Sequence, residues 1–141
     1  MQPGSYCICI RVLDDIAIRV GALETLSFPS GRYIYVGSAL NGLKQRIKHH
    51  ISTNQGKFNT VHWHIDYLLL APETKIEDIY IKESDEHEEC QITSEISIRG
   101  YPIWHFGCSD CECYSHLIWV VDFSFLPEIG MKKMFFKDLI D

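Results

Sequence analysis

The stretch from position 31 to position 50 constrains the fold most, because its apolar spacing changes part-way along. Ile34 and Val36 alternate with tyrosines and a glycine, which is the period of an extended strand. Apolar residues then recur three and four apart, at Leu40, Leu43 and Ile47, which is the spacing of one helix face. The stretch therefore predicts a strand that turns tightly and continues as a helix.

Basic side chains crowd this predicted helix. Arg46 and His50 are four residues apart, so they lie on one face, one turn from each other. Arginine offers a fork of donors that suits phosphate oxygens, and a tyrosine hydroxyl on the preceding strand can position or take a proton. The pattern predicts a phosphate-binding site, and the residues expected to hold a nucleic-acid backbone are Lys44, Arg46, Lys48, His49 and Lys57.

The distribution of charge along the chain is uneven. The net charge of −6 does not by itself predict a nucleic-acid partner. Between Arg32 and Lys57, however, there are five lysines and arginines and no acidic residue. A local basic patch of this kind can hold a phosphate backbone on a protein that is acidic as a whole.

Length and hydropathy predict a single domain without a membrane span. A chain of 141 residues is long enough to bury a core of its own. No apolar run is long enough to cross a bilayer, and no basic segment precedes an apolar run near residue 1. We therefore expect a cytoplasmic protein with no membrane partner and mostly reduced cysteines. Cys7 and Cys9, on one face of a predicted strand, are expected in the core.

Periodicity and turn residues place the remaining elements. Strands are expected at 4–12, 16–20 and 33–37, joined by short turns into an antiparallel meander. A polar loop is expected at 52–60, a helix rather than a strand at 61–70, and a strand at 76–82. An acidic helix should begin at Ser84 or Asp85 and end at Gly100, with a strand at 116–125. A terminal amphipathic helix at 127–140 would turn four side chains inward: Met131, Met134, Phe135 and Leu139. We predict no regular helix or strand at residues 101–115.

The segment 61–70 also holds a polar cluster. If it is helical, His62 and Asp66 are one turn apart and His64 points elsewhere. Two interpretations stay open, a metal or catalytic cluster and a structural helix whose polar face caps the sheet.

A cysteine-rich segment is the second candidate for a metal site. Cys108, Cys111, Cys113 and His116 form a C-x₂-C-x-C-x₂-H series, and these ligand types suit Zn²⁺. Two alternatives remain open. The thiols could be buried in a hydrogen-bonded loop, or Cys108 could form a disulfide with Cys111 or Cys113.

Two triplets and the helix that follows carry a family resemblance. Gly4-Ser5-Tyr6 on a first strand, and Tyr35-Val36-Gly37 before a helix with Arg46 and His50, resemble the GIY-YIG nuclease superfamily. The chain is more narrowly similar to the archaeal and bacterial branch catalogued as a domain of unknown function, DUF123. The phrases that suggest this branch are Gly31-Arg-Tyr-Ile-Tyr-Val-Gly-Ser-Ala, His62-Trp-His-Ile-Asp-Tyr-Leu-Leu and Ser109-Asp-Cys-Glu-Cys-Tyr-Ser-His-Leu117.

The resemblance implies a small α+β fold in which helices flank a three-stranded antiparallel sheet, with room for additional strands. It also implies phosphodiester cleavage with one divalent ion, Mg²⁺ or Mn²⁺. Carried over by position, Tyr6 would activate the attacking water, with Tyr35 in the same network. Arg46 would hold the scissile phosphate and His50 would assist. Glu89 would bind the metal, with the neighbouring Glu88 as the alternative. A tyrosine beside a metal and an arginine would ionise more readily than usual.

The chain departs from the superfamily pattern between the two triplets. The extra chain from Asp14 to Ser30 must form an added strand or hairpin, which bears on the strand register and on whether Tyr6 and Tyr35 lie together. The sequence therefore leads to one main expectation, an endonuclease acting on DNA or RNA, with a role in repair and a protein partner for targeting. A non-catalytic nucleic-acid-binding module and a metal-stabilised interaction domain are the alternatives.

Overall fold

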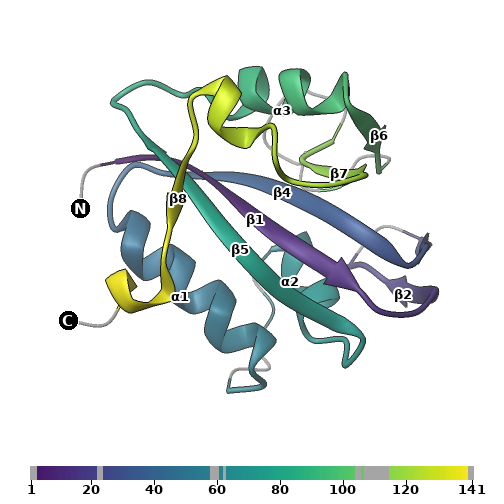
Figure 1. Ribbon diagram of the computed structural model, residues 1–141. Coiled ribbons are helices and arrows are strands. Elements are labelled where there is room, and N and C mark those ends of the chain that lie inside the picture. Colours follow the sequence, from purple (N-terminus) through teal and green to yellow (C-terminus); the bar gives the residue numbers. More distant parts are fainter. Residues whose placement is uncertain are drawn as a thin grey trace.

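A six-stranded antiparallel sheet forms the centre of the described structure (Figure 1). The computed structural model describes residues 3–21, 24–57, 61, 63–103, 106 and 115–139. The strand order is β6-β7-β4-β1-β5-β8. The bounds are β1 Gly4–Val12, β4 Gly31–Ala39, β5 Thr74–Glu83, β6 Gly100–Pro102, β7 Leu117–Val120 and β8 Lys132–Met134. The three longest strands, β4, β1 and β5, are adjacent, so the predicted α+β class with a three-stranded antiparallel core and added strands is confirmed.

Helices cover both faces of this sheet. Helices α1 (Leu43–Asn54) and α2 (His64–Leu69) pack on one face. Helix α3 (Glu89–Ser97) and the 3₁₀ turn η1 (Leu126–Ile129) pack on the other. A second 3₁₀ turn, η2 (Phe136–Leu139), follows β8. No helix in the described ranges is long and apolar enough to cross a membrane.

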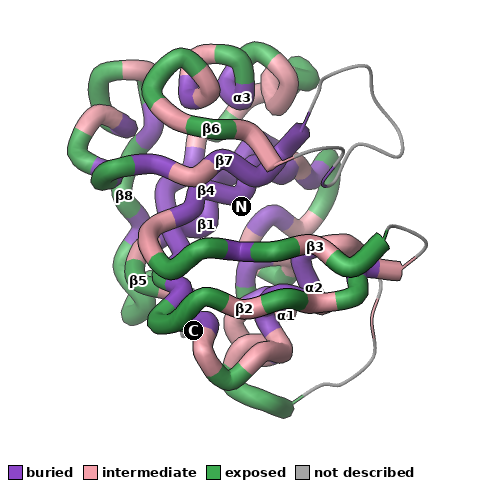
Figure 2. The backbone as a smooth tube through the Cα atoms, turned by 90° about the vertical axis from the view of Figure 1, so that its right-hand side faces the viewer, coloured by how far each residue is buried: buried purple, intermediate pink, exposed green. Residues whose placement is uncertain are grey.

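Strand β1 is buried on both sides, as its sequence predicts. Tyr6, Ile8 and Ile10 belong to the core beneath α1 and α2, whereas Cys7 and Cys9 belong to the core beneath α3. Alternate side chains of a strand point to opposite faces, so a strand with apolar residues at the consecutive positions 6–10 can serve two cores. Figure 2 shows this buried centre along β1 and β4. The prediction that both cysteines are core residues is confirmed.

The predicted meander is wrong. Strand β1 pairs with β4 along its whole length, from Gly4 opposite Ala39 to Val12 opposite Gly31. The chain between them forms a separate two-stranded hairpin of β2 (Ile16–Arg19) and β3 (Thr25–Phe28). The hairpin predicted between Asp14 and Ser30 is therefore confirmed, but it does not enter the main sheet. It lies at the more exposed periphery, where β2 contacts α2 (Figure 2).

Two helix boundaries differ from the prediction. Helix α1 continues to Asn54, so the expected loop at 52–60 begins later. Helix α3 begins at Glu89 rather than at Ser84 or Asp85. The Ser84 hydroxyl instead accepts a hydrogen bond from the Glu86 amide at 3.1 Å, which makes a local turn and not a helix cap. The helix predicted within 61–70 is confirmed as α2.

The predicted C-terminal helix is wrong, and the strand predicted at 116–125 is shorter. Gly130 has a left-handed backbone with φ 89°, which ends η1 and lets the chain turn back as β8 against β5. Met131, Met134 and Leu139 are buried as predicted, but Phe135 is 54% exposed. The segment predicted as one helix thus forms two 3₁₀ turns and a short edge strand in its described part.

Candidate active site

The pairing of β1 with β4 brings the two predicted tyrosines to one face. Tyr6 lies opposite Gly37, and Tyr35 lies opposite Ile8, the residue two positions from Tyr6. Residues in this relation are diagonal neighbours on the same face of an antiparallel pair. The hairpin insertion therefore leaves the register of the tyrosines intact.

Gly37 makes room for the Tyr6 ring. A Cβ atom at position 37 would collide with the Cζ and hydroxyl of Tyr6. Because glycine lacks that atom, the phenol ring lies directly across the backbone of β4. This close packing explains sterically why position 37, the last of the Tyr35-Val36-Gly37 triplet, is a glycine in this chain.

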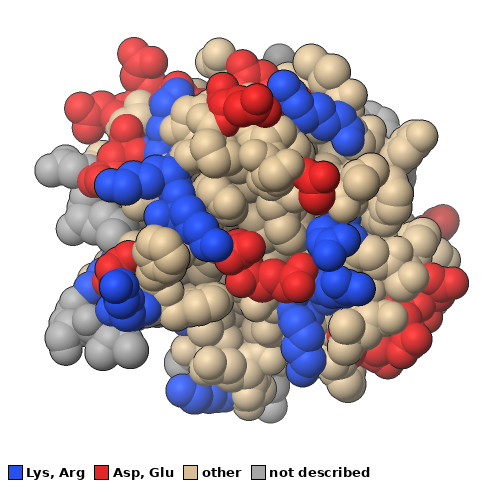
Figure 3. Space-filling view, viewed as in Figure 1, with Lys and Arg blue, Asp and Glu red and all other residues tan. Residues whose placement is uncertain are grey.

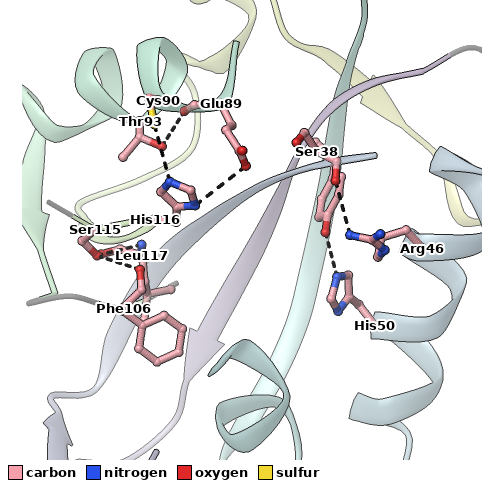
Figure 4. A network of polar contacts seen from close by, with 11 residues as sticks. Ser38, Arg46, His50, Glu89, Cys90, Thr93, Phe106, Ser115, His116 and Leu117 are labelled. Atoms are coloured by element: carbon pink, nitrogen blue, oxygen red, sulfur yellow. Dashed lines mark hydrogen bonds and ion pairs between the residues drawn. The ribbon is translucent and has the colours of Figure 1, made fainter. Parts of the chain in front are cut away.

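Helix α1 delivers Arg46 and His50 to the same place, one turn apart, as the sequence predicts. His50 Nε2 is 2.9 Å from the Tyr6 hydroxyl and is hydrogen-bonded to it (Figure 4). The His50 ring also meets the Tyr35 ring edge-on, with centroids 6.1 Å apart. His50 is fully buried. It is therefore part of the core and not half of an exposed basic pair.

Arg46 is held from two sides. Its Nη1 donates a hydrogen bond to the Ser38 carbonyl oxygen at 3.3 Å, and its guanidinium lies 4.5 Å from the centre of the Trp63 ring. A stacked guanidinium keeps its planar fork in one orientation. Arg46 is partly exposed, so this fork is accessible next to the buried tyrosines.

The structure separates the two candidate metal ligands. Glu88 forms an ion pair with Lys82, at 2.9 Å. Glu89 Oε2 instead lies 3.8 Å from His116 Nδ1, and the Glu89 side chain is 26% exposed (Figure 4). Burial is the main cause that raises the pKa of Tyr6 and Tyr35, and the negative charge of Glu89 adds to it, whereas Glu88 does not contribute.

Burial controls the protonation of the cluster. It raises the pKa of Tyr6 well above its ordinary value, and the Arg46 guanidinium beside it opposes this effect only in part. Burial likewise raises the pKa of Tyr35. Arg46 alone therefore does not make the tyrosine easier to ionise, because desolvation of the phenolate outweighs the arginine; the expectation for a tyrosine that also lies beside a metal stays a prediction. Burial lowers the pKa of His50, which is consequently neutral at pH 7.

Asp66 is a member of the cluster that sequence reasoning placed elsewhere. It is fully buried, and its Oδ1 lies 3.7 Å from His50 Nδ1. Its predicted partner, His62, lies outside the described residues, and the ring of His64 packs against Phe106. The available signal was a single acidic residue within the apolar run of α2, which is unusual unless that residue has a specific partner.

The predicted nucleic-acid-binding residues do not form one patch. Lys44 and Lys48 project from a different flank of α1 than Arg46 and His50, by the period of the helix. Lys48 and Lys57 line a depression between α1 and η2, and the ring of His49 packs against Trp63.

On the face shown in Figure 3, basic and acidic groups alternate. Among the described lysines, Lys133 and Lys82 are each paired with a carboxylate. Such pairing weakens the pull of these cations on a polyanion. Arg46 is consequently the cation best placed to meet a phosphate beside the buried cluster.

Of the predicted zinc ligands only His116 lies in the described part of the chain, because Cys108, Cys111 and Cys113 fall outside it. His116 Nε2 is 3.9 Å from Cys90 Sγ. Within the described residues no three potential ligands gather into a metal site. A single partly exposed carboxylate such as Glu89 still suits Mg²⁺ or Mn²⁺. Mg²⁺ keeps several waters and often takes only one or two carboxylates from the protein.

Fold and site together define an antiparallel α+β domain with a buried tyrosine–histidine pair beside an arginine at a strand-to-helix junction. The family model described as Domain of unknown function DUF123 matches residues 5–133. The chain therefore belongs to the DUF123 family. Searches of curated proteins and of solved structures returned no match.

Proposed function

We propose that this protein is a divalent-metal-dependent endonuclease of the GIY-YIG type that hydrolyses phosphodiester bonds in DNA or RNA. The observation that carries the proposal is the 2.9 Å contact between the Tyr6 hydroxyl and a neutral, buried His50, beside the guanidinium of Arg46. A hydroxyl and a neutral base in contact can pass a proton, and an adjacent arginine can receive a phosphate.

The raised pKa of Tyr6 indicates how the base would work. The Tyr6 hydroxyl is protonated, so it cannot accept a proton from water unless it gives up its own proton at the same time. In the proposed step a water molecule loses a proton to the Tyr6 oxygen while the Tyr6 proton passes to His50 Nε2. The water oxygen forms a bond to phosphorus, the bond to the leaving oxygen breaks, and the leaving oxygen takes a proton from solvent.

Arg46 and Glu89 have complementary roles in the proposal. Negative charge develops on the phosphate oxygens during attack, and the Arg46 fork would stabilise it. Both side chains are partly exposed, whereas Tyr6 and Tyr35 are buried, so the phosphodiester would approach from their side. Glu89 would hold Mg²⁺ or Mn²⁺, which when bound supplies further positive charge against the phosphate.

Targeting would come from outside this cluster. Acidic groups alternate with basic groups on the face shown in Figure 3, so this face attracts nucleic acid only weakly. We therefore propose that a protein partner brings the enzyme to its substrate, in the cytoplasm and in a repair reaction. The buried free thiols Cys7 and Cys9 are consistent with a reducing compartment.

A second candidate is a phosphate-binding module that keeps the fold without cleavage. It is favoured by the exposure of Tyr6, only 1%, which restricts the access of water to its hydroxyl. Binding would then depend on Arg46 and on salt, and not on a metal.

The test is cleavage of single-stranded, duplex, flap and branched DNA and their RNA counterparts, with Mg²⁺, Mn²⁺ or EDTA. Arg46→Ala is the test variant, and Arg99→Ala is its matched control. Arg99 also stacks on a ring, that of Phe125 at 5.0 Å, and donates to a carbonyl oxygen, that of Glu95, but it lies away from the cluster. Metal-dependent cleavage lost only in Arg46→Ala would support the nuclease. Binding without cleavage, lost in the same variant, would support the module, and a wild type that does neither would exclude both.

The same assay distinguishes the two glutamates. Glu89→Gln should abolish metal-dependent cleavage, whereas Glu88→Gln, which removes only the partner of Lys82, should retain it. Cleavage that survives Glu89→Gln would remove this residue from the site.

A further inference from the structure

The buried carboxylate of Asp66 lies behind His50, on the side away from Tyr6. His50 Nε2 faces the Tyr6 hydroxyl, and His50 Nδ1 faces Asp66 Oδ1. All three side chains are at most 1% exposed. They come from three different elements, β1, α1 and α2, so the alignment is a product of the tertiary fold.

The second oxygen of Asp66 fixes the orientation of the carboxylate. Asp66 Oδ2 accepts a hydrogen bond from the Trp63 amide at 3.1 Å, at the start of α2. This bond holds the carboxylate so that Oδ1 points at the imidazole. One acidic side chain thus caps its own helix and faces the histidine.

The chemistry of the carboxylate selects one form of the neutral imidazole. An ionised carboxylate only accepts hydrogen bonds, and a neutral imidazole carries one N–H and one acceptor nitrogen. The contact between Asp66 Oδ1 and His50 Nδ1 is therefore favourable when the ring proton is on Nδ1. His50 Nε2 is then free to accept a hydrogen bond from the Tyr6 hydroxyl. The separation of 3.7 Å exceeds a formed hydrogen bond, but catalytic hydrogen bonds often tighten when substrate binds.

We propose that Asp66 is a positioning residue that keeps the proton of His50 on Nδ1, so that Nε2 can accept the Tyr6 proton. The catalytic part of this inference rests on the proposed nuclease function, whereas the tautomer itself does not. Four residues from other elements face His50: Tyr6 from β1, Tyr35 from β4, and Trp63 and Asp66 from the α2 segment. Two residues of α1 itself, Arg46 and His49, also lie beside it. Among them only Asp66 has an acidic side chain.

Asp66→Asn tests the inference while keeping the helix cap. The amide oxygen of asparagine can still accept from the Trp63 amide, which turns the NH₂ group toward His50 Nδ1. A donor there favours the opposite tautomer, in which Nε2–H donates to the Tyr6 oxygen and cannot take its proton. The matched control is Asp138→Asn, because Asp138 also accepts from an amide three residues earlier, that of Phe135 at 3.1 Å, and η2 has no histidine.

The primary readout is ¹⁵N NMR of the histidine rings at pH 7.5, with the His50 signals identified by their loss in His50→Gln. We expect a protonated Nδ1 in wild type and in Asp138→Asn, and a protonated Nε2 in Asp66→Asn. A His50 tautomer that is the same in wild type and Asp66→Asn would overturn the inference. This outcome is distinct from failure of the proposed function, because the spectrum needs no substrate.

Kinetics then connect the tautomer to the reaction. We expect Asp66→Asn to lower kcat about 10²-fold or more with KM little changed, since it disables a base without removing a phosphate contact. In a His50→Gln background the same change should lower kcat no further. Equal losses of kcat in the presence and absence of His50 would show that Asp66 acts only on stability, against the inference.

Discussion

The two faces of the central sheet are built from the same strands but bury different chemistry. The face beneath α3 buries mainly thiols and apolar side chains, among them Cys7, Val36 and Ile96, and next to α3 it also buries Thr93 and His116. The face beneath α1 and α2 also has an aliphatic core, but at one end it buries Tyr6 and Asp66 around His50. Burying polar groups costs free energy unless their partners are well placed. The contrast suggests a division that can be tested: the apolar core beneath α3 chiefly stabilises the fold, while the polar cluster at one end of the other face, together with Glu89 at the start of α3, would carry the proposed reaction.

The largest effect that would sharpen this contrast is loss of cleavage in Tyr6→Phe. The change removes only the hydroxyl that contacts His50, so we expect a fall in kcat of about 10³-fold. The matched control is Tyr33→Phe, which removes a hydroxyl on the same sheet face that donates to the Pro29 carbonyl oxygen. Single-turnover cleavage measures both. Equal rates for the two variants would end the assignment of Tyr6.

The opposite result is expected from the α3 face. Ile96→Ala leaves a cavity in an apolar core, so the free energy of unfolding should fall by about 3 kcal/mol. Cleavage per folded molecule should stay within about twofold, because Ile96 belongs to the core on the other face of the sheet from Tyr6. Urea denaturation followed by cleavage at low temperature measures the two quantities. A large loss of activity in fully folded Ile96→Ala would break the division between the faces.

Gly37→Ala should affect both stability and cleavage, because Gly37 lies where the strand backbone meets the ring of Tyr6. The added Cβ collides with the ring of Tyr6, and a forced shift in a packed core costs about 2 kcal/mol. The displaced hydroxyl should also lose His50, so kcat should fall. In a Tyr6→Ala background the stability cost of Gly37→Ala should largely vanish. Equal costs in both backgrounds would show that the ring is not the source of the strain.

Local patterns predicted much of this arrangement. The alternation of residues 4–12 matches β1 as found, and helical spacing placed Arg46 and His50 on one face. These features depend on periods of two and 3.6 residues, which a short window of sequence displays. The family resemblance, and not periodicity, selected Tyr6, Tyr35 and Glu89.

The features that sequence reasoning missed depend on distant parts of the chain. Strand β2 pairs with β3 and not with β1 because both edges of β1 are occupied, one by β4 and the other by β5. The C-terminal segment has helical apolar spacing, but the open edge of β5 accepts β8 instead. Asp66 meets His50 only because α2 packs against α1. From the sequence around Asp66, the expected partner was the nearer residue His62, one helical turn away.

The smallest expected effect is a pH dependence of stability that originates at His50. Burial lowers the pKa of His50 below its ordinary value of 6.5, so the folded protein resists a proton that the unfolded chain accepts. Its contribution to stability is therefore complete above pH 6.5 and is lost as the pH falls from there toward the folded pKa. One such group changes the free energy of unfolding by at most about 1.4 kcal/mol per pH unit.

His50→Gln should reduce this slope between pH 6.5 and 5, as measured by urea denaturation at several pH values. Some slope should remain, because burial also lowers the pKa of His64 and His116. His87→Gln, at an exposed histidine, is the control and should leave the slope as in wild type. If His50→Gln also leaves the slope unchanged, then His50 does not stay neutral in the folded protein. The proton relay from Tyr6 would lose its acceptor, and the contrast between the two faces would reduce to one of packing.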